Sequence, residues 1–184
     1  MSLPDNPLHL ALFDLDHTLL DGDSNTLWLD FLIERGHLPP ATAARQTAYM
    51  ERYEAGELDI RAYLEFHLQL LADRPLAAWM PVREAFVAEC DAVDRHVALG
   101  HRSVIITATH DFLSSAIADL FGLPVIAPRG ERIDGRLSGR INGTICFREN
   151  KVSCLEDWLA QSGLAASRIG HRHFYSDSAN DLPL

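Results

Sequence analysis

The chain has 184 residues, which is enough for one domain and a sizeable insertion. Of these residues 47% are hydrophobic and 23% are charged, a composition typical of a globular protein. Its formal net charge of -10 argues against binding to nucleic acid or to an anionic membrane, since both require concentrated Lys and Arg. The first residues lack the pattern of a signal peptide, no apolar run is long enough to span a membrane, and the three cysteines form no C-x-x-C pair, so we expect a cytoplasmic protein.

The first half of the chain predicts one strand followed by helices. "LHLALFDLD", residues 8–16, is a nearly continuous apolar run that ends in acids, which is typical of a strand buried on both faces. Residues 24–99 carry the spacing of about four helices and no convincing strand. We expect the first helix to be capped by Ser24 and the fourth, which opens at Pro75, to bend near Pro81.

The second half of the chain predicts strands alternating with helices. Three glycine-containing turn pairs favour a hairpin before the last helix. The expected elements are a strand over 103–109, a helix over 110–122, a short strand over 124–128, a hairpin over 131–144, a helix over 150–163 and a strand over 171–177.

This order predicts an α/β fold with a Rossmann-like parallel sheet core, because strands that alternate with helices form a parallel sheet covered on both faces. The four-helix block between the first two strands is too long for a simple crossover, so we expect it to form a separate cap. The predicted core therefore comprises residues 1–22 and 100–184, and the predicted cap comprises residues 23–99.

Polar residues at the ends of three predicted strands point to a single site. Asp14 and Asp16 close the first strand, Thr107 and Thr109 the second, and Asp177 the last. Ligands of open parallel sheets bind beyond the carboxyl ends of the strands, so we expect these side chains to face one ligand.

Four segments of the chain resemble, in order, the motifs of the haloacid dehalogenase (HAD) superfamily of phosphatases. "DLDHTLL" resembles the D-x-D-x-T-[LV] motif, "VIITAT" the second motif, Lys151 in "ENKVSCL" the lysine that starts a helix, and "YSDSANDLPL" the final motif. The inserted helices (a C1-type cap) and the hairpin before Lys151 resemble the phosphoserine-phosphatase-like branch, subfamily IB. The resemblance covers essentially the whole chain and implies a phosphomonoester hydrolase that acts on a small phosphorylated metabolite.

The resemblance also implies the catalytic roles, and the residue types suit them. A carboxylate can attack phosphorus and form an aspartyl-phosphate, so Asp14 is expected to be the nucleophile. Asp16 would protonate the leaving alkoxide and then deprotonate the attacking water. Lys151 would stabilise the charge on the nucleophile and the phosphoryl group.

Phosphoryl oxygens are expected to meet the segment after the second strand. The Thr107 hydroxyl and the backbone N–H of Ala108 would hold them, close to the amino end of the following helix. Thr109 lies two positions later on the same face of the strand and is the rival of Thr107 for this role.

A magnesium ion is expected to offset the repulsion between the phosphate and the acids, since Mg²⁺ prefers oxygen ligands. Asp14, Asp177 and the backbone carbonyl of Asp16 would coordinate it, and Asp181 would lie nearby or bind through water. The alternative is that these acids are ordinary helix caps or turn residues, which is the reading we prefer for Asp21.

The cap is expected to select the substrate. In the phosphoserine-phosphatase-like branch an acid after the first motif binds the substrate amine, and a cap arginine binds its carboxylate. Asp23 occupies about the position of that acid, whereas Glu65 falls where the arginine is expected and Arg61 lies one turn earlier. An acidic pair favours an amine-bearing alcohol phosphate, such as histidinol phosphate, phosphoethanolamine or phosphocholine. Phosphoserine stays a candidate through Arg61, and the alternative is that both acids are solvated.

Other functions use the same residues. A phosphotransferase would pass the same phosphoryl group to an acceptor other than water, and a non-catalytic protein of this fold would bind a phosphorylated ligand. No nucleic-acid or membrane partner is expected, and the sequence does not predict an oligomeric state. Because sheets of this type continue beyond the last motif, we expect a longer protein in which residues after Leu184 complete the sheet.

Overall fold

A computed structural model describes residues 8–20, 22–89, 102–164, 169–176, 178, 181 and 183–184. Two residues singled out from the sequence, Asp21 and Asp177, lie outside the described residues. The predictions made for these two are therefore left as predictions.

The core is a parallel sheet, as predicted, and the described residues form four strands in the order β3-β2-β1-β6. The strands are β1 (Leu8–Phe13), β2 (Arg102–Ile106), β3 (Val125–Ile126) and β6 (Ile169–Tyr175). Side chains alternate between the two faces of β1, so Ala11 and Phe13 join one apolar cluster while Leu10 and Leu12 join another. Both faces of this central strand are thus buried, which explains its continuous apolar run.

Two helices that follow β2 in the chain cover the sheet, one on each face. Helix α5 (Asp111–Leu120) contributes Phe112, Leu113 and Ile117 to the cluster of Phe13. Helix α6 (Asn150–Gln161) contributes Cys154, Leu155 and Leu159 to the cluster of Leu10. The two helices hold the ends of the strands at one edge, where the loops after β1, β2 and β6 come together.

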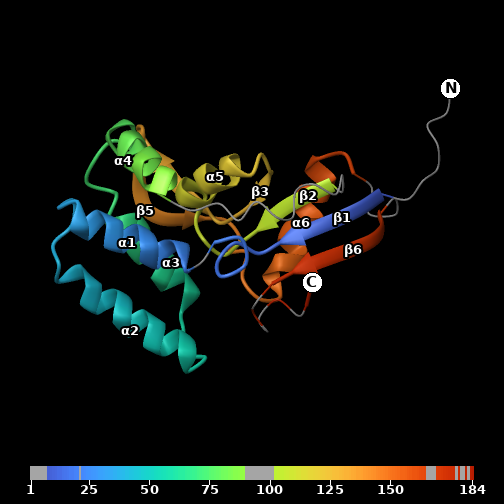
Figure 1. Cartoon of the computed structure of the whole chain (residues 1–184), viewed down its shortest axis with the longest axis horizontal. Coiled ribbons are helices and arrows are strands. Elements are labelled where there is room, and N and C mark those ends of the chain that lie inside the picture. The colour runs from blue at the N-terminus through green and yellow to red at the C-terminus, as the bar shows by residue number, and fades with distance from the viewer. Residues whose placement is uncertain are drawn as a thin grey trace.

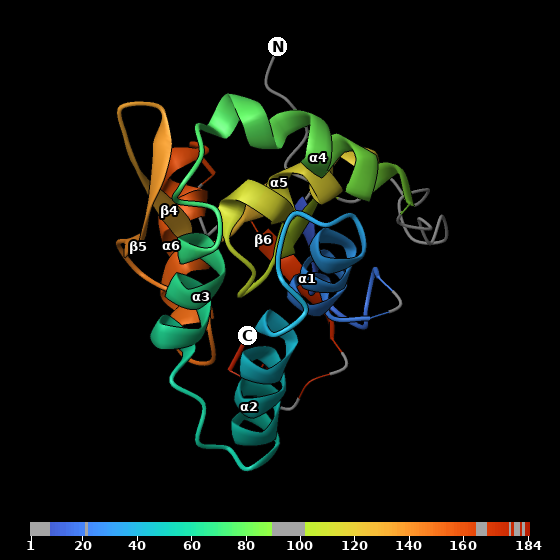
Figure 2. The same cartoon turned by 90° about the vertical axis from the view of Figure 1, so that its left-hand side faces the viewer.

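Four helices lie between β1 and β2, namely α1 (Ser24–Glu34), α2 (Thr42–Glu54), α3 (Ile60–Gln69) and α4 (Leu76–Glu89). Figure 1 shows α1, α2 and α3 beyond the arrowheads of β1 and β2, and Figure 2 shows the same helices from their own end. Helix α4 runs unbroken through Pro81.

The start of α1 corrects one expectation. Asp23, not Ser24, is the N-cap, and its Oδ1 accepts the backbone N–H of Thr26 at 2.7 Å. Asp and Ser are both common N-cap residues, and the two are adjacent in the sequence, so residue type alone did not show which of them begins the helix. Ser24 becomes the first helical residue and is fully buried.

A hairpin supports the third helix of this group. Strands β4 (Arg129–Ile133) and β5 (Arg136–Asn142) pair antiparallel, as the turn signals predicted. Helix α3 packs closely on β5, because a Cβ added at Gly139 would lie only 2.7 Å from Gln69 Cγ. The absence of a side chain at Gly139 therefore allows α3 and the hairpin to hold each other in place.

Candidate active site

The loop after β1 presents two acids at the carboxyl edge of the sheet. The backbone N–H of Asp14 donates to Tyr175 O at 2.9 Å, which joins the end of β1 to the end of β6. The carbonyl of Leu15 then accepts the N–H groups of Leu19 and Leu20, both at 3.0 Å, and closes a compact turn. Asp14 and Asp16 flank the start of this turn, so the backbone fixes both of them at one place.

Lys151 brings together two of the predicted acids. It lies in the first turn of α6, and its Nζ is 2.9 Å from Asp14 Oδ1 and 2.6 Å from Asp181 Oδ1. The lysine side chain is only 4% exposed, so the three charges meet in a largely desolvated position. Asp181 is held in turn by Ser176 Oγ, which donates to its Oδ2 at 2.7 Å.

Asp16 has a different environment. Its Oδ1 accepts the N–H of Ser24 at 2.7 Å, and its Oδ2 accepts the hydroxyl of Thr109 at 3.0 Å. Burial and then the nearby charge of Asp23 raise the pKa of Asp16 from 3.8 to about 7. A carboxyl group with such a pKa exists in both protonation states near neutral pH, which suits a group that first donates and then accepts a proton.

The segment after β2 supplies neutral polar groups. Thr107 Oγ1 accepts the N–H of Thr109 at 3.1 Å, and Thr107 is fully buried. Ala108 and Thr109 line the cavity, whereas Thr107 lies behind them and orients the Thr109 backbone. The choice between Thr107 and Thr109 as the hydroxyl that meets phosphate stays a prediction, and the structure places the Thr109 hydroxyl beside the proposed acid.

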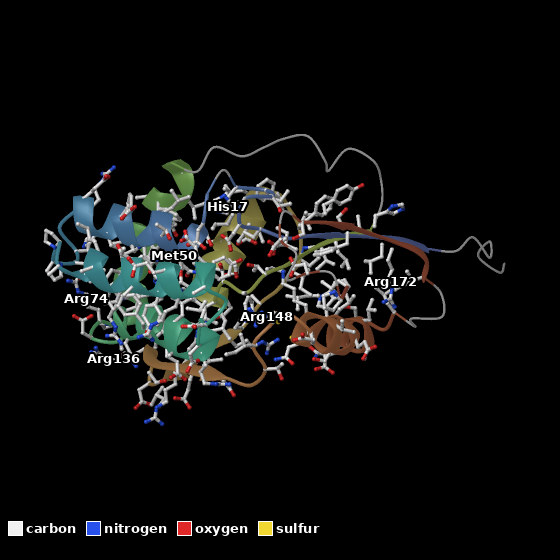
Figure 3. The ribbon with its side chains drawn as sticks, turned by 90° about the horizontal axis from the view of Figure 1, so that it is seen from below. His17, Met50, Arg74, Arg136, Arg148 and Arg172 are labelled. Atoms are coloured by element: carbon white, nitrogen blue, oxygen red, sulfur yellow. The ribbon has the colours of Figure 1, made fainter. Side chains whose placement is uncertain are left out.

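A cavity of about 540 Å³ lies between this edge of the sheet and the helices. His17, in the loop after β1, and Met50, on α2, both line it, and both are labelled in Figure 3. The sequence-predicted residues that line it are Asp14, Asp16, Asp23, Ala108, Thr109, Lys151 and Asp181. Seven predicted residues distributed over the whole chain thus share one cavity.

Glu65 and Arg61 are not part of that cavity. Glu65 Oε1 accepts the N–H of Ile141 at 3.5 Å and lies 3.6 Å from Arg61 Nη1. Arg61 in turn donates to the carbonyls of Ile141 and Gly143 at 3.5 and 3.4 Å. Both side chains therefore face the hairpin, so the structure does not bring Asp23 and Glu65 together as an acidic pair.

Several lining residues had not been singled out from the sequence. The helical side of the cavity includes Asn25, Met50, Tyr53, Glu54, Ile60, Tyr63 and Leu64, and Phe147 adds a ring from the segment before α6. A helical spacing of three and four residues relates Ile60, Tyr63 and Leu64, and this pattern was the only local signal. It marks a buried face but does not distinguish a core from a binding cavity.

The acids at the sheet edge fit a divalent cation. Asp14, Asp16 and Asp181 could carry three negative charges against the one ammonium of Lys151, and burial above all raises the pKa of Asp14. A hard dication with oxygen ligands would offset the remaining two charges. Among the described residues no group of three or more His, Cys, Asp or Glu side chains forms a metal site by itself, and the fourth predicted ligand, Asp177, lies outside them.

Comparisons with known proteins agree with the family resemblance of the sequence motifs. A family model described as haloacid dehalogenase-like hydrolase matches residues 11–184. The chain is 35% identical to a histidinol-phosphatase of Neisseria meningitidis, over 96% of this chain and 85% of that protein. It is 28% identical to a phosphoserine phosphatase of Streptococcus thermophilus, over 95% of this chain and 78% of that protein.

A solved structure also matches nearly the whole chain. A Bordetella pertussis protein of unknown function is 40% identical and superposes with a TM-score of 0.85, over 97% of this chain and 86% of that one. Within the described part of the chain, no helix combines the length and the apolar character needed to cross a membrane.

Proposed function

Because the chain belongs to the haloacid dehalogenase-like hydrolase family and is a phosphatase acting on small phosphorylated substrates, we propose that it hydrolyses an amine-bearing alcohol phosphate, with histidinol phosphate as the first candidate. The composition of the cavity wall carries this proposal. Besides Asp14, Asp16, Lys151 and Asp181, the described lining residues include two further acids, Asp23 and Glu54, and three aromatic rings, but no arginine. Phosphoserine carries a carboxylate that would need a cation at this place.

The positions of the arginines also favour a substrate without a carboxylate. Arg61 is bound to the hairpin, and Figure 3 shows Arg74 and Arg136 at the helical end of the molecule and Arg172 at the opposite end. Arg148 lies nearer, with its guanidinium carbon 5.1 Å from the centroid of the Phe147 ring, but it does not line the cavity. Histidinol phosphate carries an ammonium group, as phosphoserine does, but it has a heteroaromatic ring where phosphoserine has a carboxylate. The acids suit the ammonium, and the rings of Tyr53, Tyr63 and Phe147 suit the imidazole.

Asp14 is the proposed nucleophile. Its carboxylate forms a bond to phosphorus as the bond to the alcohol oxygen breaks, and Asp16 supplies the proton that this oxygen takes up. Asp16, now ionised, accepts a proton from the water that releases phosphate and regenerates Asp14. Lys151 already touches Asp14, so its ammonium is placed to stabilise the charge that passes between carboxylate and phosphoryl group.

Magnesium is the proposed cofactor, since phosphatases of this family generally use it. Asp14, the backbone carbonyl of Asp16, Asp177 and Asp181 would hold it, and it would supply positive charge beside the phosphoryl oxygens. Phosphate oxygens would also meet the Thr107 or Thr109 hydroxyl and the N–H of Ala108. We assign residues 1–22 and 100–184 to the core and 23–99 to a cap, because the cavity walls divide in this way.

The proposal is tested by phosphate release from a panel of substrates at fixed Mg²⁺. We expect kcat/KM for histidinol phosphate to exceed that for phosphoserine by about tenfold or more, since phosphoserine would bury an unpaired carboxylate. Preference for phosphoserine would contradict the proposal. Product analysis with an added alcohol separates hydrolysis from phosphotransfer, because only a transferase yields a new phosphate ester.

A further inference from the structure

One buried acceptor in the cavity has no partner. Asn25 lines the cavity and is 3% exposed, yet its Oδ1 makes no hydrogen bond within the described part of the chain. A buried amide oxygen without a donor is costly, and such atoms are uncommon in folded proteins. Asn25 and Asp23 both line the cavity, so a ligand is the natural source of that donor.

The neighbouring hydrogen bonds fix which end of the amide is free. Thr109 has one hydroxyl proton, which it donates to Asp16, so it can only accept from its other two partners. These partners are Ser24 Oγ at 2.8 Å and Asn25 Nδ2 at 3.3 Å. The nitrogen end of Asn25 is therefore used by the protein, and the oxygen end remains.

Asp23 offers a second acceptor nearby. Its Oδ1 is used twice, by the N–H of Thr26 at 2.7 Å and by the hydroxyl of Thr26 at 2.8 Å. Its Oδ2 makes no hydrogen bond to any described residue, and Asp23 lines the same cavity. An ammonium group has three N–H donors and no acceptor, so a carboxylate oxygen and an amide oxygen suit it together.

We propose that Asn25 Oδ1 accepts a hydrogen bond from the ammonium group of the substrate, beside the carboxylate of Asp23. The inference rests on the proposed function and adds a specificity residue to it. Asn25 would distinguish a substrate that carries the amine from one that lacks it, because only the amine satisfies the buried oxygen. An apolar substrate would leave Asn25 Oδ1 without a donor.

The test uses two substrates that differ only in this group, namely histidinol phosphate and the analogue in which hydrogen replaces the amine. Asn25→Leu removes the acceptor at similar volume, and Asn25→Asp keeps an acceptor oxygen. We expect Asn25→Leu to reduce the preference for the amine substrate, measured as the ratio of kcat/KM values, about tenfold and chiefly through KM. Asn25→Asp is expected to retain the preference.

Asn142→Leu, on the exposed end of β5, is the matched control and should keep the parent ratio. Asn25→Ser replaces the leucine variant if that variant fails to fold, because serine cannot reach the amine. An unchanged ratio in Asn25→Leu, or an equal loss on both substrates, would overturn the inference. A parent enzyme that does not prefer the amine substrate would instead remove the proposed function, and this inference with it.

Discussion

The sheet side and the helical side of the cavity hold their polar groups in opposite ways. On the sheet side, charged groups are in direct contact, with Lys151 between Asp14 and Asp181. On the helical side, neutral groups form a buried chain in which Gln46 Nε2 donates to Tyr63 at 3.2 Å and Gln46 Oε1 lies 3.0 Å from His67 Nε2. The sheet side thus concentrates charge, whereas the buried chain on the helical side is neutral.

Because of this difference, we expect the sheet side to control catalysis and the helical side to control substrate selectivity. Phosphoryl transfer needs fixed charges, and every phosphate ester presents the same group to them. The remainder of the substrate varies, and it meets the rings and acceptors of the helices. Changes on the sheet side should therefore lower turnover of all substrates, and changes on the helical side should alter the choice among them.

The largest effect is expected from Asp14→Asn. Removing the nucleophile should lower kcat by at least about 10³-fold with every substrate, because no aspartyl-phosphate can form. The asparagine oxygen can still accept from Lys151, so the thermal unfolding temperature should stay close to that of the parent. Phosphate release from p-nitrophenyl phosphate and histidinol phosphate measures the first effect. Asp30→Asn, on the exposed face of α1, is the control, and full activity in Asp14→Asn would refute the assignment.

A slightly smaller effect is expected at Lys151, which is the only lysine in the chain. Lys151→Met should lower kcat about 10²-fold and cost roughly 3–5 kcal/mol of stability without metal, since Asp14 and Asp181 would remain buried and unpaired. Added Mg²⁺ should restore more stability to this variant than to the parent.

Lys151→Arg keeps the positive charge at this position but changes the shape of the charged group. A compact ammonium reaches two carboxylates at 2.9 and 2.6 Å, whereas a planar guanidinium requires a different geometry. We expect Lys151→Arg to recover stability but little activity. Thermal unfolding with EDTA and with Mg²⁺, next to steady-state kinetics, gives both readouts. Arg140→Met, an exposed change on β5, should match the parent in each.

The sheet side could be predicted from the sequence because its signals are local. Asp14 and Asp16 end an apolar strand, and the residues around Lys151 have the periodicity of a helix. In a parallel sheet the carboxyl ends of strands meet at one edge, so sequence order alone brought these groups together. The predicted residue at the end of β6, Asp177, lies outside the described residues, so its place at this edge is not tested.

The helical side could not be predicted in the same way, because the facing of each helix depends on tertiary packing. Glu65 was aligned with a substrate-binding position, but α3 turns it toward β5, where Gly139 allows a close approach. Asn25 is one polar residue among many in the sequence, and only the contacts of Thr109 reveal which of its atoms is free. Periodicity identifies a buried face but not what that face will meet.

A smaller effect is expected where the two sides meet, at Asp16 and Asp23. The charge of Asp23 helps to raise the pKa of Asp16 to about 7, so Asp23→Asn should lower that pKa. Protonated Asp16 is needed for the leaving alkoxide, so kcat/KM for histidinol phosphate should fall as pH rises through this pKa. In Asp23→Asn this fall should begin at lower pH. Asparagine also caps helices, so α1 should remain intact.

A second substrate and a second variant test whether this alkaline fall in kcat/KM comes from Asp16. p-Nitrophenyl phosphate has a good leaving group and needs little proton donation, so its profile should show a weaker alkaline fall in both enzymes. Glu54→Gln removes another acid of the cavity that does not contribute to the raised pKa of Asp16, and its profile should match the parent. An alkaline fall that stays in place in Asp23→Asn would argue against Asp16 as the acid.

The smallest effect concerns the neutral interior of the helical side. His67 is buried, and burial, then the nearby His110, lowers its pKa well below 6.5. The folded protein keeps this ring neutral, whereas the unfolded chain takes up a proton as pH falls through 6.5. The free energy of unfolding should therefore decrease below about pH 6.5, by up to about 1.4 kcal/mol per pH unit for this histidine.

His67→Gln tests this reading, because glutamine can still donate to Gln46 but does not titrate. Its unfolding temperature should depend less steeply on pH between 6.5 and 5 than that of the parent. His173→Gln, which replaces an exposed histidine on β6, should keep the parent slope. Because His67 lies behind Gln46 and not in the cavity, the same variant should leave the preference for the amine substrate intact. A steep acid slope in His67→Gln would mean that other groups control the acid stability of the helical side.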